Sequence, residues 1–221
     1  MMPSNSIKAS LSAARIGTYE NILGGPAGAQ QTEKALRLYM WNAQVSAAFF
    51  VPLHVCEVIM RNAISEVLET VYGTRWPWSI GFERSLPIPP HGYKPKDDLI
   101  NGRRNQPTTG KVIPELKFVF WQKLLTGRFD TRLWNNNMMT VFPHAAAQGM
   151  TVAQLRQSLY NDLETVRKLR NRIAHHEPII SRNLEDDFAT IKRIIRYRCQ
   201  HSLEWMLNNQ MLLPLLTLKP N

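Results

Sequence analysis

The chain has 221 residues, of which 44% are hydrophobic and 20% are charged. This composition is typical of a folded globular protein and excludes a disordered or fibrous chain. Lysine and arginine outnumber aspartate and glutamate by 27 to 17, which gives a formal net charge of +10. Such an excess favours an anionic partner, either nucleic acid or an acidic membrane surface, but it indicates attraction and not chemistry.

The two cysteines, Cys56 and Cys199, form no Cys-x-x-Cys motif and leave no second pair for a disulfide framework, so we expect a reducing compartment. Residues 1–17 lack the continuous apolar segment of a secretory signal. The apolar stretch at 205–218 contains polar residues and Pro214 and is too short to span a bilayer. We therefore expect a cytoplasmic protein without a membrane-spanning segment.

Two helices are predicted before a central change in composition. The first covers about 32–51, with Thr32 as a suitable N-cap and Pro52 as the interruption. The second covers about 53–72, where apolar residues recur at helical spacing, and Gly73 suits its end.

Residues 74–113 contain six prolines together with several lysines and arginines. They are predicted to form a long, basic insertion between helices, partly ordered by four aromatic residues, Trp76, Trp78, Phe82 and Tyr93. A structureless segment of this length is usually functional or disordered.

Three further helices are predicted after this segment. Pro114 suits the first turn of a helix with an apolar face made by Phe118, Trp121, Leu124 and Leu125. Thr151 and Gln154 have the spacing of a capping box, and the apolar periodicity behind them continues up to Pro178. The last helix covers about 184–207, acidic at its start and basic later, as the helix dipole favours.

These elements predict an all-α helical bundle with no internal repeat and no convincing strand. Residues 1–31, rich in Ser, Gly, Ala and Gln, are predicted to be a flexible arm with at most one short helix. Residues 32–221 are predicted to form a single domain with an insertion at about 74–113.

Arg170 is predicted near the middle of the apolar stripe of the helix that begins at Thr151. Because arginine keeps its charge, a buried guanidinium needs a carboxylate, a phosphate or a group from a partner chain. One interpretation is structural: the side chain reaches solvent or pairs with an acid in the core. The other is that Arg170 holds a scissile phosphate and stabilises its added negative charge.

His175 and His176 come just before Pro178, where the helix is expected to end. An imidazole exchanges protons near neutral pH, so it can accept the proton of a ribose 2′-hydroxyl or donate one to the leaving oxygen. The alternative is a helix C-cap. Adjacent histidines lack the i,i+4 spacing of a helical metal-ligand pair, so we expect no metal and no other cofactor.

On a regular helix Arg170 and His175 point about 140° apart and do not converge by themselves. Asn171 lies one turn before His175 and is placed to orient it. Arg172 stands in the same relation to His176. A complete site would need a distorted last turn or a second copy of the motif across a two-fold interface.

Two supporting groups are predicted elsewhere. Glu57 and Arg61 form a favourable i,i+4 pair, which is either a purely structural ion pair or a support that packs beside Arg170 and positions it. The predicted insertion supplies four candidate RNA-binding cations: Lys94, Lys96, Arg103 and Arg104. With Tyr93 as a stacking platform they can bind RNA, or they form a solvated basic loop.

The hexapeptide that begins at Arg170 resembles the motif of HEPN ribonucleases, in which an arginine and a polar residue precede a histidine: Arg170-Asn171-Arg172-Ile173-Ala174-His175. Its extension through Ile179 resembles the form found in Abi-like proteins of bacterial phage defence. Three more segments resemble that group, and the resemblance covers about residues 33–207: LYMWN at 38–42, EVIMRNAI at 57–64 and FWQKL at 120–124.

This resemblance implies an α-helical homodimer in which two arginines and two histidines surround one RNA site without metal. It implies that Arg170 and His175 are the catalytic pair and that Asn171 supports them. It also implies a role in abortive infection or as a toxin that cleaves cellular or phage RNA, with a regulatory RNA or an antitoxin as a possible further partner. The rival hypotheses are a non-catalytic RNA-binding or protein-docking module and a peripheral membrane protein.

Overall fold

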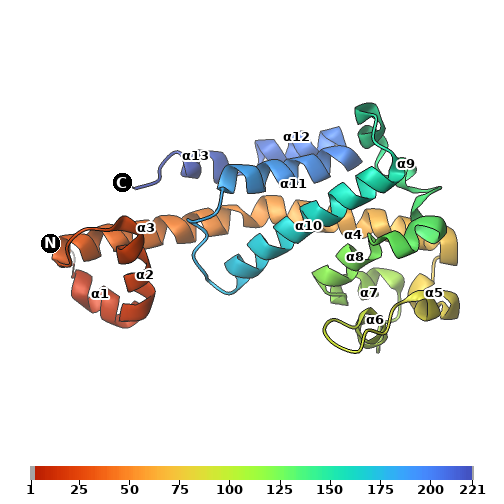
Figure 1. The fold of residues 1–221 in the computed structure, drawn as a ribbon, viewed down its shortest axis with the longest axis horizontal. Coiled ribbons are helices and arrows are strands. Elements are labelled where there is room, and N and C mark those ends of the chain that lie inside the picture. The colour runs from red at the N-terminus through yellow and green to blue at the C-terminus, as the bar shows by residue number, and fades with distance from the viewer. Residues whose placement is uncertain (1–2, 221) are drawn as a thin grey trace.

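The computed structural model describes residues 3–220, except for the side chain of Ala147, and that part of the chain is helical with no strand. Helices α3 (Ala29–Ala48) and α4 (Phe50–Tyr72) follow one another along a single line through the molecule, and several other helices pack against them (Figure 1). The all-α class predicted from the sequence is therefore confirmed.

The junction between α3 and α4 lies at Phe49, not at Pro52. Phe49 keeps right-handed helical dihedrals, φ −65° and ψ −19°, and its carbonyl accepts the Leu53 amide at 3.0 Å. Pro52 lies in the first turn of α4, where its missing N–H costs least. The predicted interruption at Pro52 is therefore wrong. Gly73, with φ 84°, ends α4 as predicted.

By length and composition, this continuous helix of Ala29–Tyr72 is able to cross a membrane, with a mean hydropathy of 1.5 in its most apolar stretch. The central helix of a globular domain has the same properties, and 33% of this stretch is buried in the protein. Helices α2, α11 and α8 pack against different parts of it.

The N-terminal segment contains two helices, α1 (Ser4–Leu11) and α2 (Ala13–Leu23), where at most one short helix was expected. Both pack against α3, and Ile16 and Tyr19 are buried between them. Thr32 is not the N-cap of α3, which is Gly28; its hydroxyl donates to Oε1 of Glu20 at 2.7 Å instead. The predicted N-cap is wrong because α3 begins three residues earlier, at Ala29, so that Thr32 lies inside the helix.

Residues 74–113 are ordered by aromatic packing, as the sequence predicts. The indole of Trp76 is buried edge-to-face against Phe82 and Trp121, with ring centroids 5.5 and 6.1 Å apart. The segment forms a 3₁₀ turn and three short helices: η1 (Trp76–Trp78), α5 (Ile80–Ser85), α6 (Pro95–Gly102) and α7 (Thr109–Glu115).

Pro114 lies in the last turn of α7 and does not begin the next helix. Leu116 and Lys117 are extended, and α8 (Phe118–Leu124) starts after them. The prediction was wrong because Pro114, whose φ is fixed at a helical value, lies inside a short helix that begins five residues earlier, although proline is best tolerated in a first turn. The connection to α10 contains η2 (Gly127–Phe129), η3 (Asp130–Trp134), α9 (Met138–Val141) and η4 (Pro143–Gln148).

Helix α10 (Val152–Ala174) begins with the predicted capping box, in which Thr151 and Gln154 bond each other's backbone amides. It packs between α8 and α11 (Leu184–Arg198). The predicted helix over 184–207 is two helices, because Cys199 is extended and its sulfur caps α12 (Gln200–Asn208). The chain ends beyond α13 (Leu212–Leu216), which packs on α3.

Candidate functional site

Arg170 lies near the end of α10, where the apolar stripe of this helix is no longer buried. Leu163 and Val166, two turns and one turn earlier, are buried, and so is the neighbouring Leu169, but the Arg170 side chain is 43% exposed. Its Nε donates to Oε2 of Glu57 on α4 at 3.3 Å. Within residues 3–220, no hydrogen bond is made by its two terminal nitrogens. The guanidinium is therefore held at one edge and free at the other.

Glu57 is shared by two arginines. One carboxylate oxygen accepts from Arg61, one turn later on α4, and the other accepts from Arg170. Arg61 also donates to the carbonyls of Ile113 and Pro114, at 3.5 and 3.3 Å. The two interpretations of the Glu57–Arg61 pair are thus compatible: it is a structural ion pair, and it contacts Arg170 as well.

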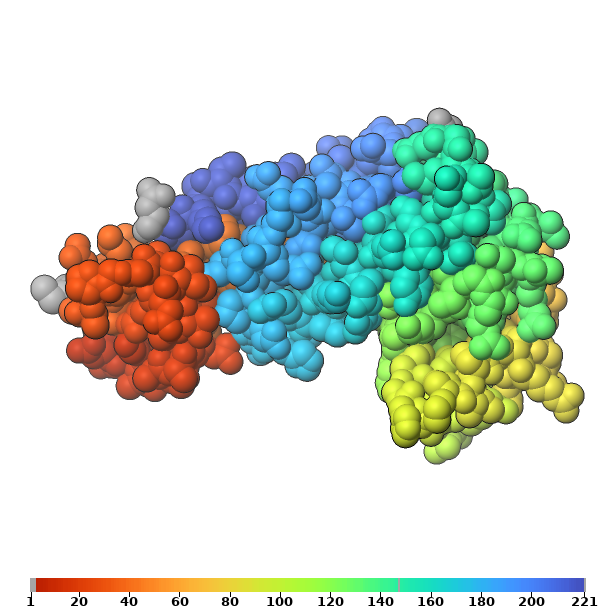
Figure 2. Space-filling view, viewed as in Figure 1, coloured from red at the N-terminus to blue at the C-terminus, as the bar shows by residue number. Residues whose placement is uncertain are grey.

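An open groove of about 440 Å³ runs beside this network. Figure 2 shows the surface hollowed between the end of α10 and the segment of residues 85–115. The groove is mostly apolar, with Glu57, Arg61 and Arg170 as its charged groups; its lining is Phe50, Leu53, His54, Glu57, Val58, Arg61, Pro114, Arg170, Ile173 and Ala174. His175 is not among these residues.

The two histidines lie on a tight turn that ends α10. His176 has φ 54°, in the left-handed region, and its amide donates to the Ile173 carbonyl at 3.1 Å. The Glu177 amide donates to the Arg172 carbonyl at 2.8 Å, which completes a Schellman motif. The backbone therefore caps the helix, and both imidazoles are exposed. We call residues 175–177 the histidine turn.

The structure does not bring Arg170 and His175 together on one helix. The His175 amide keeps the ordinary i,i−4 bond to the Asn171 carbonyl at 2.9 Å, so the helix is regular up to this residue. The divergence of about 140° therefore persists. Within residues 3–220 the Asn171 side chain bonds nothing, and Arg172 bonds Glu177 and the Pro178 carbonyl rather than His176.

Two of the four candidate RNA-binding cations form ion pairs with one acidic residue. Glu83 accepts from Arg103 at 2.7 Å and pairs with Lys96 at 3.2 Å, and these bonds hold the pKa of its carboxyl below the usual range. Lys94 and Arg104 are exposed. Glu83 of α5 therefore neutralises two of the four cations, and the role of the four in RNA binding stays a prediction.

Tyr93 is half-buried, and its hydroxyl donates to Asp98 at 2.6 Å. Burial, with this bond to an acid, raises the pKa of the Tyr93 hydroxyl. The ring is thus fixed by its polar end. No group of three or more His, Cys, Asp or Glu in the described range is placed to hold a metal ion.

Two contacts around the histidine turn were missed by the sequence analysis. Arg15 of α2 donates to the His176 carbonyl at 2.7 Å, and the buried Asn42 accepts the Ile179 amide at 2.8 Å. These partners are 161 and 137 residues apart, so no local pattern could have revealed them.

Comparison with known proteins adds no relative to this description. No family model, no curated protein and no solved structure matches the chain.

Proposed function

We propose that the protein is a metal-independent endoribonuclease of the HEPN type, acting in phage defence or as a toxin. The observation that carries the proposal is the state of Arg170: Glu57 holds its Nε, while within residues 3–220 the two terminal nitrogens have no partner and lie beside an open groove. A planar guanidinium presented in this way matches two oxygens of a phosphate.

The proposed reaction is attack of a ribose 2′-hydroxyl on its own phosphate. His175, exposed at the end of α10, accepts the hydroxyl proton or protonates the leaving 5′-oxygen. Arg170 stabilises the charge that develops on the phosphate. The products carry a 2′,3′-cyclic phosphate and a 5′-hydroxyl, and DNA is excluded because it lacks the attacking group.

A homodimer is part of the proposal, because α10 is regular through His175 and one copy separates the two groups. An apolar stripe of exposed side chains supports it: Met40, Phe50, Val51 and Val58. Along the continuous α3–α4 helix Met40, Val51 and Val58 are separated by close to whole numbers of turns, so they share a face, and Phe50 lies about 80° to one side of it. Phe50 and Val58 also line the groove with Arg170. A second copy of the chain bound to this surface would place its own arginine and histidines next to those of the first copy.

The test is cleavage of RNA by the purified protein in excess chelator. We expect 2′,3′-cyclic phosphate ends, and Arg170→Ala and His175→Ala should each lower the rate at least about 100-fold. Arg37→Ala is the matched control, because Arg37 is an exposed arginine of α3 paired only with Glu33. Undiminished cleavage by both site variants would contradict the assignment.

The Arg170–Glu57 pair also favours a second candidate, a non-catalytic module that binds RNA or docks a protein. In that case Arg170 is a structural residue, and replacing it changes the stability of the protein. The wild type itself cuts no RNA. Toxicity in cells separates the two: the enzyme predicts that wild type is toxic and His175→Ala is harmless, whereas the binding module predicts equal effects from both.

A further inference from the structure

The N-terminal helices contact the turn that carries His175. Nη1 of Arg15, in the first turn of α2, donates to the carbonyl of His176 at 2.7 Å. Within the described residues this is the only hydrogen bond of the Arg15 side chain. A charge-assisted bond of this length is among the stronger hydrogen bonds in proteins. The N-terminal segment thus contacts the candidate site.

Helix α2 is held firmly enough to place Arg15. Ile16 and Tyr19 are buried against α3. The carboxylate of Glu20 accepts from Lys8 of α1 at 2.8 Å and from Thr32 of α3 at 2.7 Å, which ties three helices together. The position of Arg15 is therefore set by packing and by a shared carboxylate.

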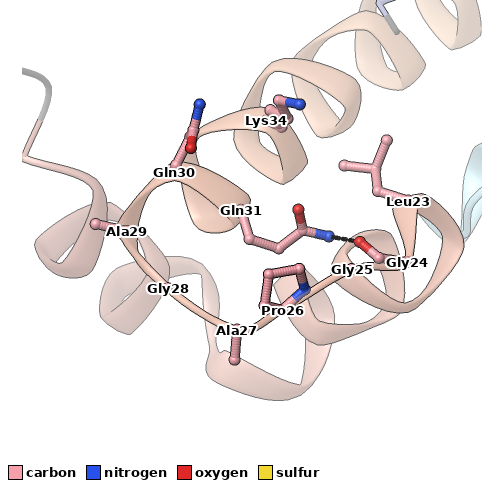
Figure 3. A pocket seen from close by; sticks show the side chains of 10 residues that line it. All are labelled: Leu23, Gly24, Gly25, Pro26, Ala27, Gly28, Ala29, Gln30, Gln31 and Lys34. Atoms are coloured by element: carbon pink, nitrogen blue, oxygen red, sulfur yellow. Dashed lines mark hydrogen bonds between the residues drawn. The ribbon is translucent and has the colours of Figure 1, made fainter.

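The connection from α2 to α3 is anchored as well. Gly24 and Gly25 take positive φ values that glycine adopts without strain. The side-chain amide of Gln31 reaches back across this loop to the Gly24 carbonyl and also donates to the Glu20 carbonyl at 3.2 Å (Figure 3). The loop therefore fixes the angle at which α2 returns along α3.

The histidine turn needs an external contact more than most helix ends do. His176 occupies the left-handed position of a Schellman motif, where glycine is the usual residue. A side chain with a Cβ is strained there. Arg15 bonds the carbonyl of this residue, and Arg172 bonds the Pro178 carbonyl at 3.1 Å on the other side. The turn is thus held at both ends.

We propose that Arg15 is a positioning residue for the histidine turn and that the α1–α2 hairpin is a structural part of the active site. The inference rests on the proposed ribonuclease function for its catalytic consequence. Arg15 does not touch substrate in this proposal; it keeps His175 at one orientation by holding the residue that follows it.

Amide hydrogen exchange of the full chain tests the contact without substrate. Arg15→Ala should speed exchange of the His176 and Glu177 amides about tenfold, since losing a bond from a charged donor weakens the turn. Arg15→Lys should restore part of the protection, and Arg37→Ala should leave it unchanged. Adding His176→Gly to Arg15→Ala should restore protection, because glycine adopts the turn without help.

Cleavage kinetics test the catalytic consequence. Arg15→Ala should lower kcat and leave KM unchanged, and Arg15→Lys should recover part of kcat. Equal exchange rates in wild type and Arg15→Ala overturn the inference, and so does an unchanged kcat alongside faster exchange. A wild type that cuts no RNA contradicts the proposed function and not the contact, which the exchange data decide separately.

Discussion

At the scale of single residues, Glu57 organises the charges of the site. Its side chain is 17% exposed and that of Arg61 is 14% exposed, so both groups have lost much of their water. Arg61 has a buried Nε without a partner among the described residues, and its other nitrogens depend on Glu57 and on two carbonyls of α7. Removing the carboxylate would leave a cation in a poorly solvated place.

We expect Glu57→Ala to lower the free energy of unfolding by about 2 kcal/mol, the cost of leaving a partly buried charged partner unsatisfied. Urea denaturation measures the change. Glu33→Ala, which removes an exposed i,i+4 partner of Arg37, should cost no more than about 0.5 kcal/mol. Equal losses in the two variants would show that Glu57 is no more than a surface partner.

At the scale of elements, α10 carries both the motif and the strongest helix start in the chain. The Gln154 amide donates to the Thr151 hydroxyl at 3.3 Å, and the Thr151 amide donates to the Gln154 side chain at 2.9 Å. The capping box satisfies two amides that would have no partner inside the helix. Arg170 lies at the far end of the same helix, so the geometry of the site depends on the stability of α10.

Thr151→Ala should lower the free energy of unfolding by about 1 kcal/mol, because it removes the cap. Thr70→Ala is the matched control: the Thr70 hydroxyl donates to the Glu66 carbonyl inside α4, a bond that adds little to an existing helix. Thermal or urea unfolding of the two variants gives the comparison. A control as unstable as Thr151→Ala would contradict the assignment of the effect to capping.

At the scale of the whole molecule, the apolar stripe on α3–α4 is the surface on which the proposed dimer depends. Phe50 is 68% exposed at the edge of this stripe, beside the groove that Arg170 lines. An exposed apolar side chain of this size, next to others on the same two helices, favours burial against another protein surface.

Phe50→Asp should therefore convert the proposed dimer to a monomer and abolish cleavage, since a charge within the interface is costly to bury. Light scattering over a range of protein concentrations measures the assembly. Ile88→Asp is the control, because Ile88 is equally exposed, at 70%, but lies outside the stripe. A wild type that stays monomeric at high concentration would contradict the dimer.

Much of the fold could be predicted because its determinants are local. The capping box at Thr151, the end of α4 at Gly73 and the apolar periodicity of α10 depend on residues within a few turns of one another. Prolines were less informative, because Pro52 lies in the first turn of α4 and Pro114 inside α7, and neither marks the helix boundary that was predicted from it. The break at Cys199 carries no glycine or proline, and its extended backbone gave no local signal.

The sequence by itself determined the all-α class and the presence of an arginine and two histidines at the end of one long helix. Only the tertiary structure decided which charges are free, because an ion pair forms with whichever acid the fold brings near. Glu83 forms ion pairs with Lys96 and Arg103, while Glu57 binds one edge of the Arg170 guanidinium and leaves the other edge without a partner among the described residues. Periodicity is a property of neighbouring residues, whereas pairing joins separate segments of the chain, 20 residues apart for Arg103 and Glu83 and 113 for Arg170 and Glu57.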